Sequence, residues 1–336
     1  MTHPLAWIDD ESAAWAARGL KRSLRNAGRP LVDFASNDYL GLASDDRVIA
    51  AANAAAKAHG WGAGASPLVT GWTAAHEALS AEIAAFERTE AAVLFPTGYA
   101  ANLGTIAALV GKPDVIYSDR LNHACLIDGS RLSGATIHVY PHNDIDTLAG
   151  LLNADRGRFR RSLIVTDGVF SMDGDLAPFG QLADLAEAHD AMLMVDEAHG
   201  TGVFGPDGRG AAAEFGVAER VTVKVGTLSK ALGSVGGFVA GSRRLIDWLI
   251  NHARPLIFST AAPPATAAAA QEALQISVAE PWRRERARAL GDRLRVEIAR
   301  AGFEVIPATG PIVAVVLGEP SAALGLSAGL EDRGFL

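Results

Sequence analysis

Two side chains with reactive potential follow apolar runs in the sequence. Lys230 comes just after the run Val221 to Gly226, and Asp196 ends the run Met192 to Asp196. A lysine partly removed from water has a lowered pKa, and its free amine can attack a carbonyl compound. A carboxylate at the end of a buried strand is costly unless a cation or hydrogen-bond donors compensate it. Alone, either residue has a structural interpretation, as a solvated lysine or as an aspartate that caps a turn.

Further polar residues follow these two predicted strands or two others. His123, Ser171, His199 and Thr227 all do so, and in an open parallel sheet such loops converge around a ligand. Asp196 could pair with the protonated ring nitrogen of a pyridine cofactor, which keeps the ring able to accept electrons. His199 and Ser171 could face the phenolic oxygen of that cofactor. His123 could stack on the ring, or it could be a structural residue in the first turn of a helix.

A possible phosphate site begins at Gly98 and Tyr99, where a predicted helix opens after the strand Ala91 to Phe95. The backbone N–H groups at a helix N-terminus bind anions, and the hydroxyl of Thr227 could contribute to the same site. The sequence therefore predicts a site for pyridoxal 5'-phosphate, with Lys230 as its Schiff-base partner.

The elements that position these residues follow an α/β pattern, in which short apolar runs alternate with helical stretches. Several runs are almost entirely apolar, as expected where helices cover both faces of a sheet. We expect a mostly parallel seven-stranded sheet with right-handed crossovers. The expected strands are Ala91 to Phe95, Val115 to Ser118, Thr136 to Tyr140, Leu163 to Thr166, Met192 to Asp196, Val221 to Gly226 and Gly237 to Ala240. Helical spacing marks Ala100 to Val110, Ile145 to Leu152 and Phe179 to His189.

Both ends of the chain add further elements. The predicted helices are Arg47 to His59, Ala74 to Arg88, Pro264 to Val278, Pro281 to Ala301 and Ser321 to Arg333, with strands at Phe303 to Ile306 and Ile312 to Leu317. We therefore expect an N-terminal segment (1–45), a large α/β domain (46–241) and a smaller α+β C-terminal domain (242–336). The two strands of that last domain form a sheet that looks incomplete.

Composition excludes several classes of function. The chain of 336 residues is 49% hydrophobic and carries a formal charge of −8, which argues against a general nucleic-acid binder. Its single cysteine, Cys125, makes disulfide and zinc chemistry improbable. We find no apolar stretch long enough for a membrane span and no leader, and expect a cytoplasmic protein. The basic residues Arg18, Lys21, Arg22 and Arg25 form either a local basic patch or a solvated helix face.

Two motifs suggest other chemistries. The segment Gly200-Thr-Gly-Val-Phe-Gly205 matches the dinucleotide fingerprint, but Pro206-Asp-Gly208 follows where a helix should open. Asp196-Glu-Ala-His199 matches a helicase-type acidic box, yet no phosphate loop of the form G-x-x-x-x-G-K-[ST] precedes it. Neither motif has the context that its function requires.

Six ordered motifs, spread from about residue 18 to the end, resemble the α-oxoamine synthases, pyridoxal-phosphate enzymes of aspartate-aminotransferase fold type I. They are Ser36-Asn-Asp-Tyr-Leu-Gly-Leu42, Thr97-Gly-Tyr-Ala-Ala-Asn102, Asp119-Arg-Leu-Asn-His-Ala124, Gly168-Val-Phe-Ser-Met-Asp-Gly-Asp175, Val195-Asp-Glu-Ala-His-Gly-Thr-Gly202 and Thr227-Leu-Ser-Lys-Ala-Leu-Gly233.

The resemblance implies a role for each candidate residue. Lys230 is the Schiff-base lysine, Asp196 binds the pyridine nitrogen, and His199 and Ser171 lie near the phenolic oxygen. His123 stacks on the ring, and Gly98, Tyr99 and Thr227 bind the phosphate. The remaining implied contacts are Asn37 near the amino-acid carboxylate, Arg22 or Lys21 near the acyl substrate, and Ser259 and Thr260 at the phosphate of a second subunit of a homodimer.

Within this family, the motifs most resemble the members that condense L-alanine with a pimeloyl thioester, on CoA or a carrier protein, to give 8-amino-7-oxononanoate for biotin. Other members of the family, which act as glycine acetyltransferases, serine palmitoyltransferases or 5-aminolevulinate synthases, remain alternatives. So does a non-catalytic protein that keeps the cofactor site.

Three departures from the family pattern accompany the resemblance. Asp167 stands where relatives usually have glutamate, and Glu197 where they often have a second aspartate. Relatives continue for about fifty more residues, which complete the small domain and carry an arginine for the substrate carboxylate. The sequence therefore leads us to expect an incomplete C-terminal domain and a weakened carboxylate site.

Overall fold

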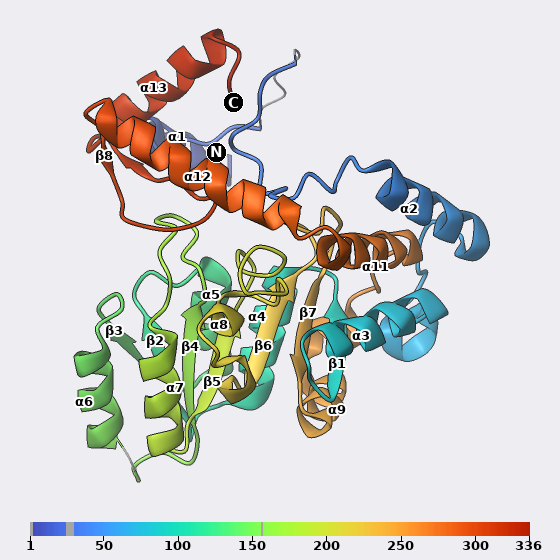
Figure 1. The fold of residues 1–336 in the computed structure, drawn as a ribbon. Coiled ribbons are helices and arrows are strands. Elements are labelled where there is room, and N and C mark those ends of the chain that lie inside the picture. Colours follow the sequence, from blue (N-terminus) through green and yellow to red (C-terminus); the bar gives the residue numbers. More distant parts are fainter. Residues whose placement is uncertain (1–2, 25–29, 156) are drawn as a thin grey trace.

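The computed structural model describes residues 3–24, 30–155 and 157–336, and its centre is a seven-stranded sheet (Figure 1). The strand order is β1-β7-β6-β5-β4-β2-β3. The strands are β1 (Ala91–Phe95), β2 (Val115–Asp119), β3 (Thr136–Tyr140), β4 (Ser162–Asp167), β5 (Met192–Asp196), β6 (Val223–Thr227) and β7 (Gly237–Gly241). Strands β3, β2, β4, β5 and β6 pair in parallel, whereas β7 is antiparallel to both β1 and β6. The predicted, mostly parallel sheet is confirmed.

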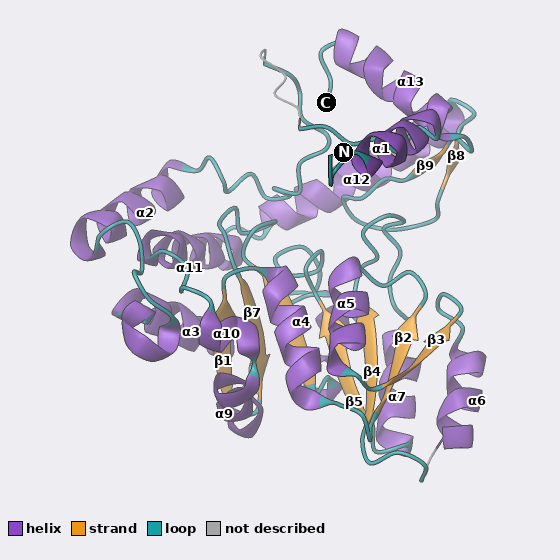
Figure 2. Ribbon diagram, turned by 180° about the vertical axis from the view of Figure 1, so that it is seen from behind, coloured by secondary structure: helices purple, strands orange, loops and turns teal. Residues whose placement is uncertain are grey.

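Helices cover both faces of this sheet, which explains its nearly continuous apolar strands. Helices α4 (Gly98–Leu109) and α5 (Ala124–Ser133) lie on one face, and α6 (Ile145–Asp155) and α7 (Phe179–Ala188) on the other (Figures 1 and 2). Side chains alternate between the faces. On β4, for example, Val165 packs in the cluster that contains α4, while its neighbour Ile164 packs in the cluster that contains α7.

The other helices flank the sheet or lie above it. They are α1 (Trp7–Ala17), α2 (Asp46–His59), α3 (Ala74–Phe86), α8 (Ala211–Glu214), α9 (Arg243–His252), α10 (Arg254–Phe258), α11 (Pro264–Ala279), α12 (Trp282–Arg300) and α13 (Pro320–Asp332), with the short π-helix η1 (Pro67–Gly71) and 3-10 helix η2 (Ala218–Arg220). No range was predicted from the sequence for α1, α5, α8, α9 or α10. Within the three described ranges, no helix is both long and apolar enough to cross a bilayer.

The two ends of the chain lie side by side above the sheet, near α12 and α13 (Figure 1). The N–H of Val32 donates to the carbonyl of Gly334 over 2.8 Å, and the N–H of Leu336 donates to Val32 over 2.9 Å. The predicted C-terminal strands are present but shorter, as β8 (Glu304–Val305) and β9 (Val315–Val316), and they form a two-stranded sheet.

Packing continues across the predicted domain boundary at residue 242. Helices α9 and α10, which follow it, contact α4 and β1 beside the large sheet, and α11 contacts α2 and α3. The division into segments 1–45, 46–241 and 242–336 remains a prediction.

Candidate active site

A cavity of about 270 Å³ lies at the loops that follow the parallel strands. It brings together residues from distant motifs of the sequence. The predicted site residues that line it are Gly98, Tyr99, His123, Ser171, Asp196, His199, Thr227 and Lys230. The convergence of loops expected for a parallel sheet therefore gathers most of the candidate residues around one space.

Asp196 is a buried carboxylate at the end of β5, with a donor on each oxygen. Its Oδ1 accepts the N–H of Ala198 over 2.8 Å, and its Oδ2 accepts the side-chain amide of Asn102 over 2.7 Å. Burial raises the pKa of Asp196 above its usual value, and the charge of Lys230 and the hydrogen bonds from Ala198 and Asn102 partly offset this effect. Lysine and donors thus favour the ionised form that could pair with a ring nitrogen.

Asp167 ends β4 directly beside Asp196 in the sheet register. Its Oδ2 accepts the backbone N–H of His123 over 2.7 Å. Burial raises the pKa of Asp167 well above its usual range, and the neighbouring carboxylate of Asp196 raises it further. Two adjacent buried carboxylates resist double ionisation, so Asp167 holds a proton more readily than an exposed aspartate does.

His123 is the N-cap residue of α5 and lines the cavity. Its Nδ1 lies 2.8 Å from the sulfur of Cys125 and accepts the backbone N–H of Cys125 over 3.2 Å. Burial, followed by the charges of Asp196 and Asp167, raises the pKa of the Cys125 thiol far above its usual range. Cys125 is therefore a neutral buried thiol that supports His123, not a nucleophile. Within 3–24, 30–155 and 157–336, no group of His, Cys, Asp and Glu side chains could hold a metal ion.

Lys230 and His199 lie against each other, with Nζ of the lysine 2.9 Å from Nε2 of the imidazole. Burial lowers the pKa of Lys230, although the carboxylates of Asp196 and Asp167 oppose this effect. Burial and then the charges of Lys230 and His123 lower the pKa of His199 to about 3. His199 is therefore neutral at physiological pH, and Lys230 is closer to its free amine form than an exposed lysine would be.

The anion site is predicted at the N-terminus of α4, where Gly98 and Tyr99 line the cavity. Thr97 caps this helix, since its Oγ1 accepts the N–H of Ala100 over 3.0 Å, and the first-turn N–H groups of Gly98 and Tyr99 have no helical acceptor. A Cβ at Gly98 would come within 3.2 Å of Oγ1 of Thr227, so glycine keeps this approach open. The hydroxyls of Thr227 and Ser229 lie 2.8 Å apart in the same cavity.

These groups fit pyridoxal 5'-phosphate by their chemistry. The cavity contains an amine for its aldehyde, a buried carboxylate for its ring nitrogen, and a helix N-terminus with hydroxyls for its phosphate.

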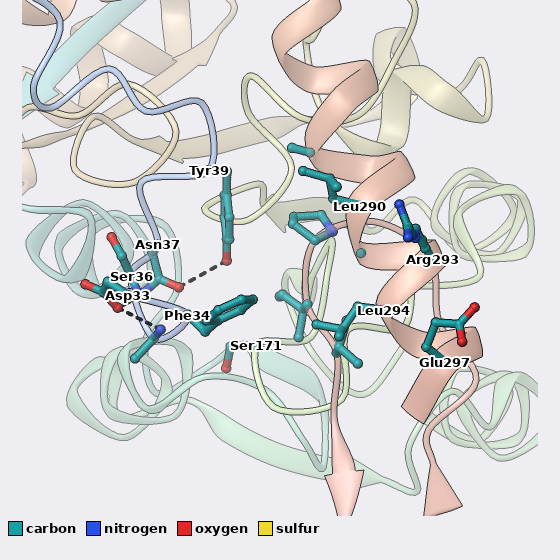
Figure 3. A pocket seen from close by; sticks show the side chains of 16 residues that line it. Asp33, Phe34, Ser36, Asn37, Tyr39, Ser171, Leu290, Arg293, Leu294 and Glu297 are labelled. Atoms are coloured by element: carbon teal, nitrogen blue, oxygen red, sulfur yellow. Dashed lines mark hydrogen bonds between the residues drawn. The ribbon is translucent and has the colours of Figure 1, made fainter. Parts of the chain in front are cut away.

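A second cavity of about 600 Å³ adjoins the first, and Ser171 lines both. Figure 3 shows Phe34, Asn37 and Tyr39 on one side of this second cavity and Leu290 and Leu294 of α12 opposite. Asn37 thus lines the larger cavity rather than the smaller one.

The remaining predicted residues lie elsewhere. Arg22 is exposed, and its guanidinium lies 5.9 Å from the ring centroid of Trp15. Thr260 is exposed after α10. Arg18, Lys21 and Arg22 follow the end of α1, so their interpretation as part of a helix face is wrong, and Arg25 lies outside the described residues.

Sequence reasoning missed Asn102 and Tyr39, which contact Asp196 and His199. Asn102 holds Asp196, and the hydroxyl of Tyr39 lies 2.6 Å from Nδ1 of His199. Asn102 lies one helical turn after Gly98, a spacing that places both on the same side of α4 and could have identified it. Nothing local in the sequence points from Tyr39 to His199.

The two misleading motifs have structural explanations. Glu197 is buried, and its two oxygens accept the N–H groups of Ala211 and Ala212 at 2.8 Å each. A Cβ at Gly200 would overlap Oε2 of Glu197, and Gly202 and Gly205 have φ values of 81° and 86°. These glycines serve a tight loop around Glu197 rather than a dinucleotide.

Comparison with known proteins places the chain in a family. Residues 29–334 match the family model described as aminotransferase class I and II. The chain is 50% identical to the 8-amino-7-oxononanoate synthase of Anaeromyxobacter dehalogenans, over 98% of this chain and 85% of that protein. It is also 50% identical to the protein of the same name from Alkalilimnicola ehrlichii, over 98% and 87% of the two chains.

Solved structures agree with this placement. A serine palmitoyltransferase from S. paucimobilis with bound PLP–myriocin superposes with a TM-score of 0.91 at 30% identity, covering 98% of this chain and 89% of that one. The 8-amino-7-oxononanoate synthase of Francisella tularensis gives a TM-score of 0.79 at 29% identity, covering 91% and 87%. The chain therefore belongs to the aminotransferase class I and II family and, within it, to the α-oxoamine synthases that use pyridoxal phosphate.

Proposed function

We propose that the protein condenses L-alanine with a pimeloyl thioester, on CoA or a carrier protein, to give 8-amino-7-oxononanoate, CO2 and the free thiol in biotin biosynthesis. The proposal is carried by one observation, the cavity that holds the Lys230 amine, the Asp196 carboxylate and the α4 N-terminus together. Support for the particular reaction comes from relatives of 50% identity that bear the corresponding name.

Pyridoxal 5'-phosphate, when bound, supplies an aldehyde for amines and a pyridinium ring that accepts the electron pair of a carbanion. Asp196 would hold a proton on the ring nitrogen. Nζ of Lys230 takes the proton from Cα of alanine and returns a proton to the product, because its lowered pKa leaves the amine available. His123 lies at the cavity wall, held by Asp167 and Cys125, where it covers one side of the reacting atoms.

The larger cavity offers space for the acyl thioester next to Ser171 and Asn37. Its lining combines apolar side chains such as Phe34 and Leu294 with polar ones. A chain of methylene groups with a polar end matches such a mixed lining.

A second candidate is a serine palmitoyltransferase-type reaction, which the TM-score of 0.91 favours. The two candidates share the cofactor chemistry and differ in amino acid and acyl chain. A matrix of alanine, glycine and serine against pimeloyl-, acetyl-, succinyl- and palmitoyl-CoA separates them.

We expect the pair of alanine and pimeloyl-CoA to give product at least a hundredfold faster than any other pair, because pocket shape and charge discriminate between such substrates. Preferred turnover of serine with palmitoyl-CoA would favour the second candidate. Growth of a biotin auxotroph supplied with this gene tests the reaction in cells. Cofactor binding without turnover of any pair would refute both enzymatic candidates in favour of a non-catalytic protein.

We further infer a homodimer with the active site near the interface. Support comes from apolar side chains exposed on two elements in contact, Leu68 and Val69 of η1 and Phe258 of α10, which are 52%, 74% and 67% exposed. Thr260 follows Phe258 and would then approach the phosphate of the partner. Light scattering should give the mass of two chains, and Val69→Glu should lower it; a fully active monomer would contradict the inference.

A further inference from the structure

A chain of hydrogen bonds leads from Lys230 to the wall of the larger cavity. Nζ of Lys230 lies 2.9 Å from Nε2 of His199, and Nδ1 of His199 lies 2.6 Å from the hydroxyl of Tyr39. The hydroxyl of Tyr39 in turn donates to Oδ1 of Asn37 over 3.1 Å, a contact drawn in Figure 3. Tyr39 therefore connects the wall of one cavity to the reactive amine of the other.

The donors in this chain all point the same way. Oδ1 of Asn37 can only accept, so the single hydroxyl proton of Tyr39 is directed toward it. The oxygen of Tyr39 then accepts from Nδ1–H of His199. A neutral imidazole has one N–H, so Nε2 carries a lone pair and accepts from Lys230.

The charge states of the two middle residues are fixed by burial. Burial lowers the pKa of His199 to about 3, and the charges of Lys230 and His123 act in the same direction. Burial also raises the pKa of Tyr39 above its usual range, so the phenol keeps its proton. Both residues therefore stay neutral at physiological pH. The position of the imidazole proton then decides whether Nε2 of His199 faces Lys230 as a hydrogen-bond donor or as an acceptor.

We propose that Tyr39 is a positioning residue that fixes His199 in the Nδ1–H tautomer and so keeps Nε2 as a hydrogen-bond acceptor for Lys230. This inference rests on the proposed function only for the role of Lys230 toward the cofactor. It does not depend on the amino acid or the acyl chain.

Removal of the Tyr39 hydroxyl has a definite expected consequence. Nδ1–H would be left buried without an acceptor, which is costly, so the proton moves to Nε2. A donor then faces Lys230, and the ammonium form loses a hydrogen bond. The other groups that face Lys230, namely Asp196, Asp167 and Cys125, are unchanged. The pKa of Lys230 therefore falls in Tyr39→Phe.

The first test follows the uptake of pyridoxal 5'-phosphate by the cofactor-free chain of 336 residues, by absorbance, as a function of pH. Only the free amine of Lys230 reacts, so the rate profile reports its pKa. In Tyr39→Phe we expect the midpoint to fall by about one pH unit, with uptake about tenfold faster on the acid side and an unchanged plateau. Tyr117→Phe, which loses a buried hydroxyl contact to Asp155 at 3.4 Å, is the matched control and should leave the midpoint unchanged.

Superimposable profiles, or a midpoint that rises in Tyr39→Phe, would overturn the proposal. A second measurement needs no cofactor. Nitrogen-15 NMR of histidine-labelled protein should show the proton of His199 on Nδ1 in the wild type and on Nε2 in Tyr39→Phe, with the resonance assigned through His199→Gln. A proton on Nε2 in the wild type would overturn the inference even if the chain takes up cofactor normally. Failure of the wild type to take up cofactor, with the proton on Nδ1, would instead count against the role of Lys230 in the proposed function.

Discussion

The side-chain amide of Asn102 donates to Oδ2 of Asp196 over 2.7 Å, which joins the second turn of α4 to the end of β5. The same helix begins at Gly98, which belongs to the predicted phosphate site. One element therefore orients both the anion site and the carboxylate proposed for the ring nitrogen.

Asn102→Leu should weaken cofactor binding, because the carboxylate of Asp196 loses its side-chain amide donor and its pKa rises. We expect the dissociation constant of pyridoxal 5'-phosphate to increase roughly tenfold, the typical effect of losing a hydrogen bond to a charged group. The loss should be larger at low pH, where Asp196 becomes protonated. Cofactor titrations at several pH values measure both effects, with Asn251→Leu on α9 as a control. A pH-independent loss would contradict the link to Asp196.

Lys230→Ala should abolish both turnover and the long-wavelength absorbance of the bound cofactor, because no other amine lines the smaller cavity within the part of the chain that the structure describes. The exposed Lys112 offers a control, since Lys112→Ala should change neither property. An unaltered cofactor spectrum in Lys230→Ala would refute the assignment of the lysine.

Asp196→Asn should retain the cofactor and lose rate. Asparagine keeps the shape of the side chain but cannot hold a proton on the ring nitrogen, so the ring accepts electrons poorly. We expect kcat to fall by roughly a hundredfold or more. The measurement is steady-state turnover of cofactor-saturated protein, compared with Asp146→Asn on the exposed side of α6. Turnover at the wild-type level would remove Asp196 from the mechanism.

The sheet could be predicted because helices cover both of its faces. Its strands are therefore nearly continuous apolar runs, such as Met192–Asp196, which can be recognised without an alternating pattern. The extent of helix α5 was not predicted because Asp128, Gly129 and Ser130 interrupt its apolar pattern. A Cβ at Gly129 would come within 3.0 Å of Ile106, so this glycine allows α5 to lie close against α4. The need for glycine at this position can be inferred only when the position of α4 is known.

In the site too, the residues that a local pattern marks could be predicted, and the contacts between residues distant in the sequence could not. Lys230, Asp196 and His199 could be predicted because each follows a strand, and strand ends converge in such sheets. The contacts of these residues with Asn102 and Tyr39 could not, because Asn102 is 94 residues from Asp196 and Tyr39 is 160 residues from His199. These contacts depend on the folded arrangement of the chain, which no local sequence pattern encodes.

Gly200→Ala should destabilise the fold, because the added Cβ would overlap the carboxylate of Glu197 that holds the start of α8. We expect a loss of roughly 2–4 kcal/mol in the free energy of unfolding. Gly150→Ala is the matched control, since Gly150 lies inside α6 with nothing within 4 Å of its added Cβ and should gain about 0.5–1 kcal/mol. Denaturant unfolding of both variants provides the comparison, and equal stabilities would show that the loop around Glu197 yields easily.

His142 should make the stability of the chain depend on pH. Its Nδ1 lies 3.0 Å from Asp119 and its Nε2 lies 2.8 Å from Asp175, which ties the loop that carries Ser171 to the end of β2. Burial opposes the charged imidazole, but the hydrogen bonds and charges of Asp119 and Asp175 outweigh it and raise the pKa of His142.

Because the folded pKa is raised, the charged His142 stabilises the fold fully below the ordinary histidine pKa of about 6.5, and this contribution is lost as pH rises through the higher folded pKa. His142→Gln should therefore lower the free energy of unfolding by about 1 kcal/mol at pH 5.5 and by less at pH 8.5. Urea unfolding at the two pH values, with the exposed His59→Gln as control, measures the difference. If the variant lost more stability at pH 8.5 than at pH 5.5, the charged bridge between Asp119 and Asp175 would be refuted.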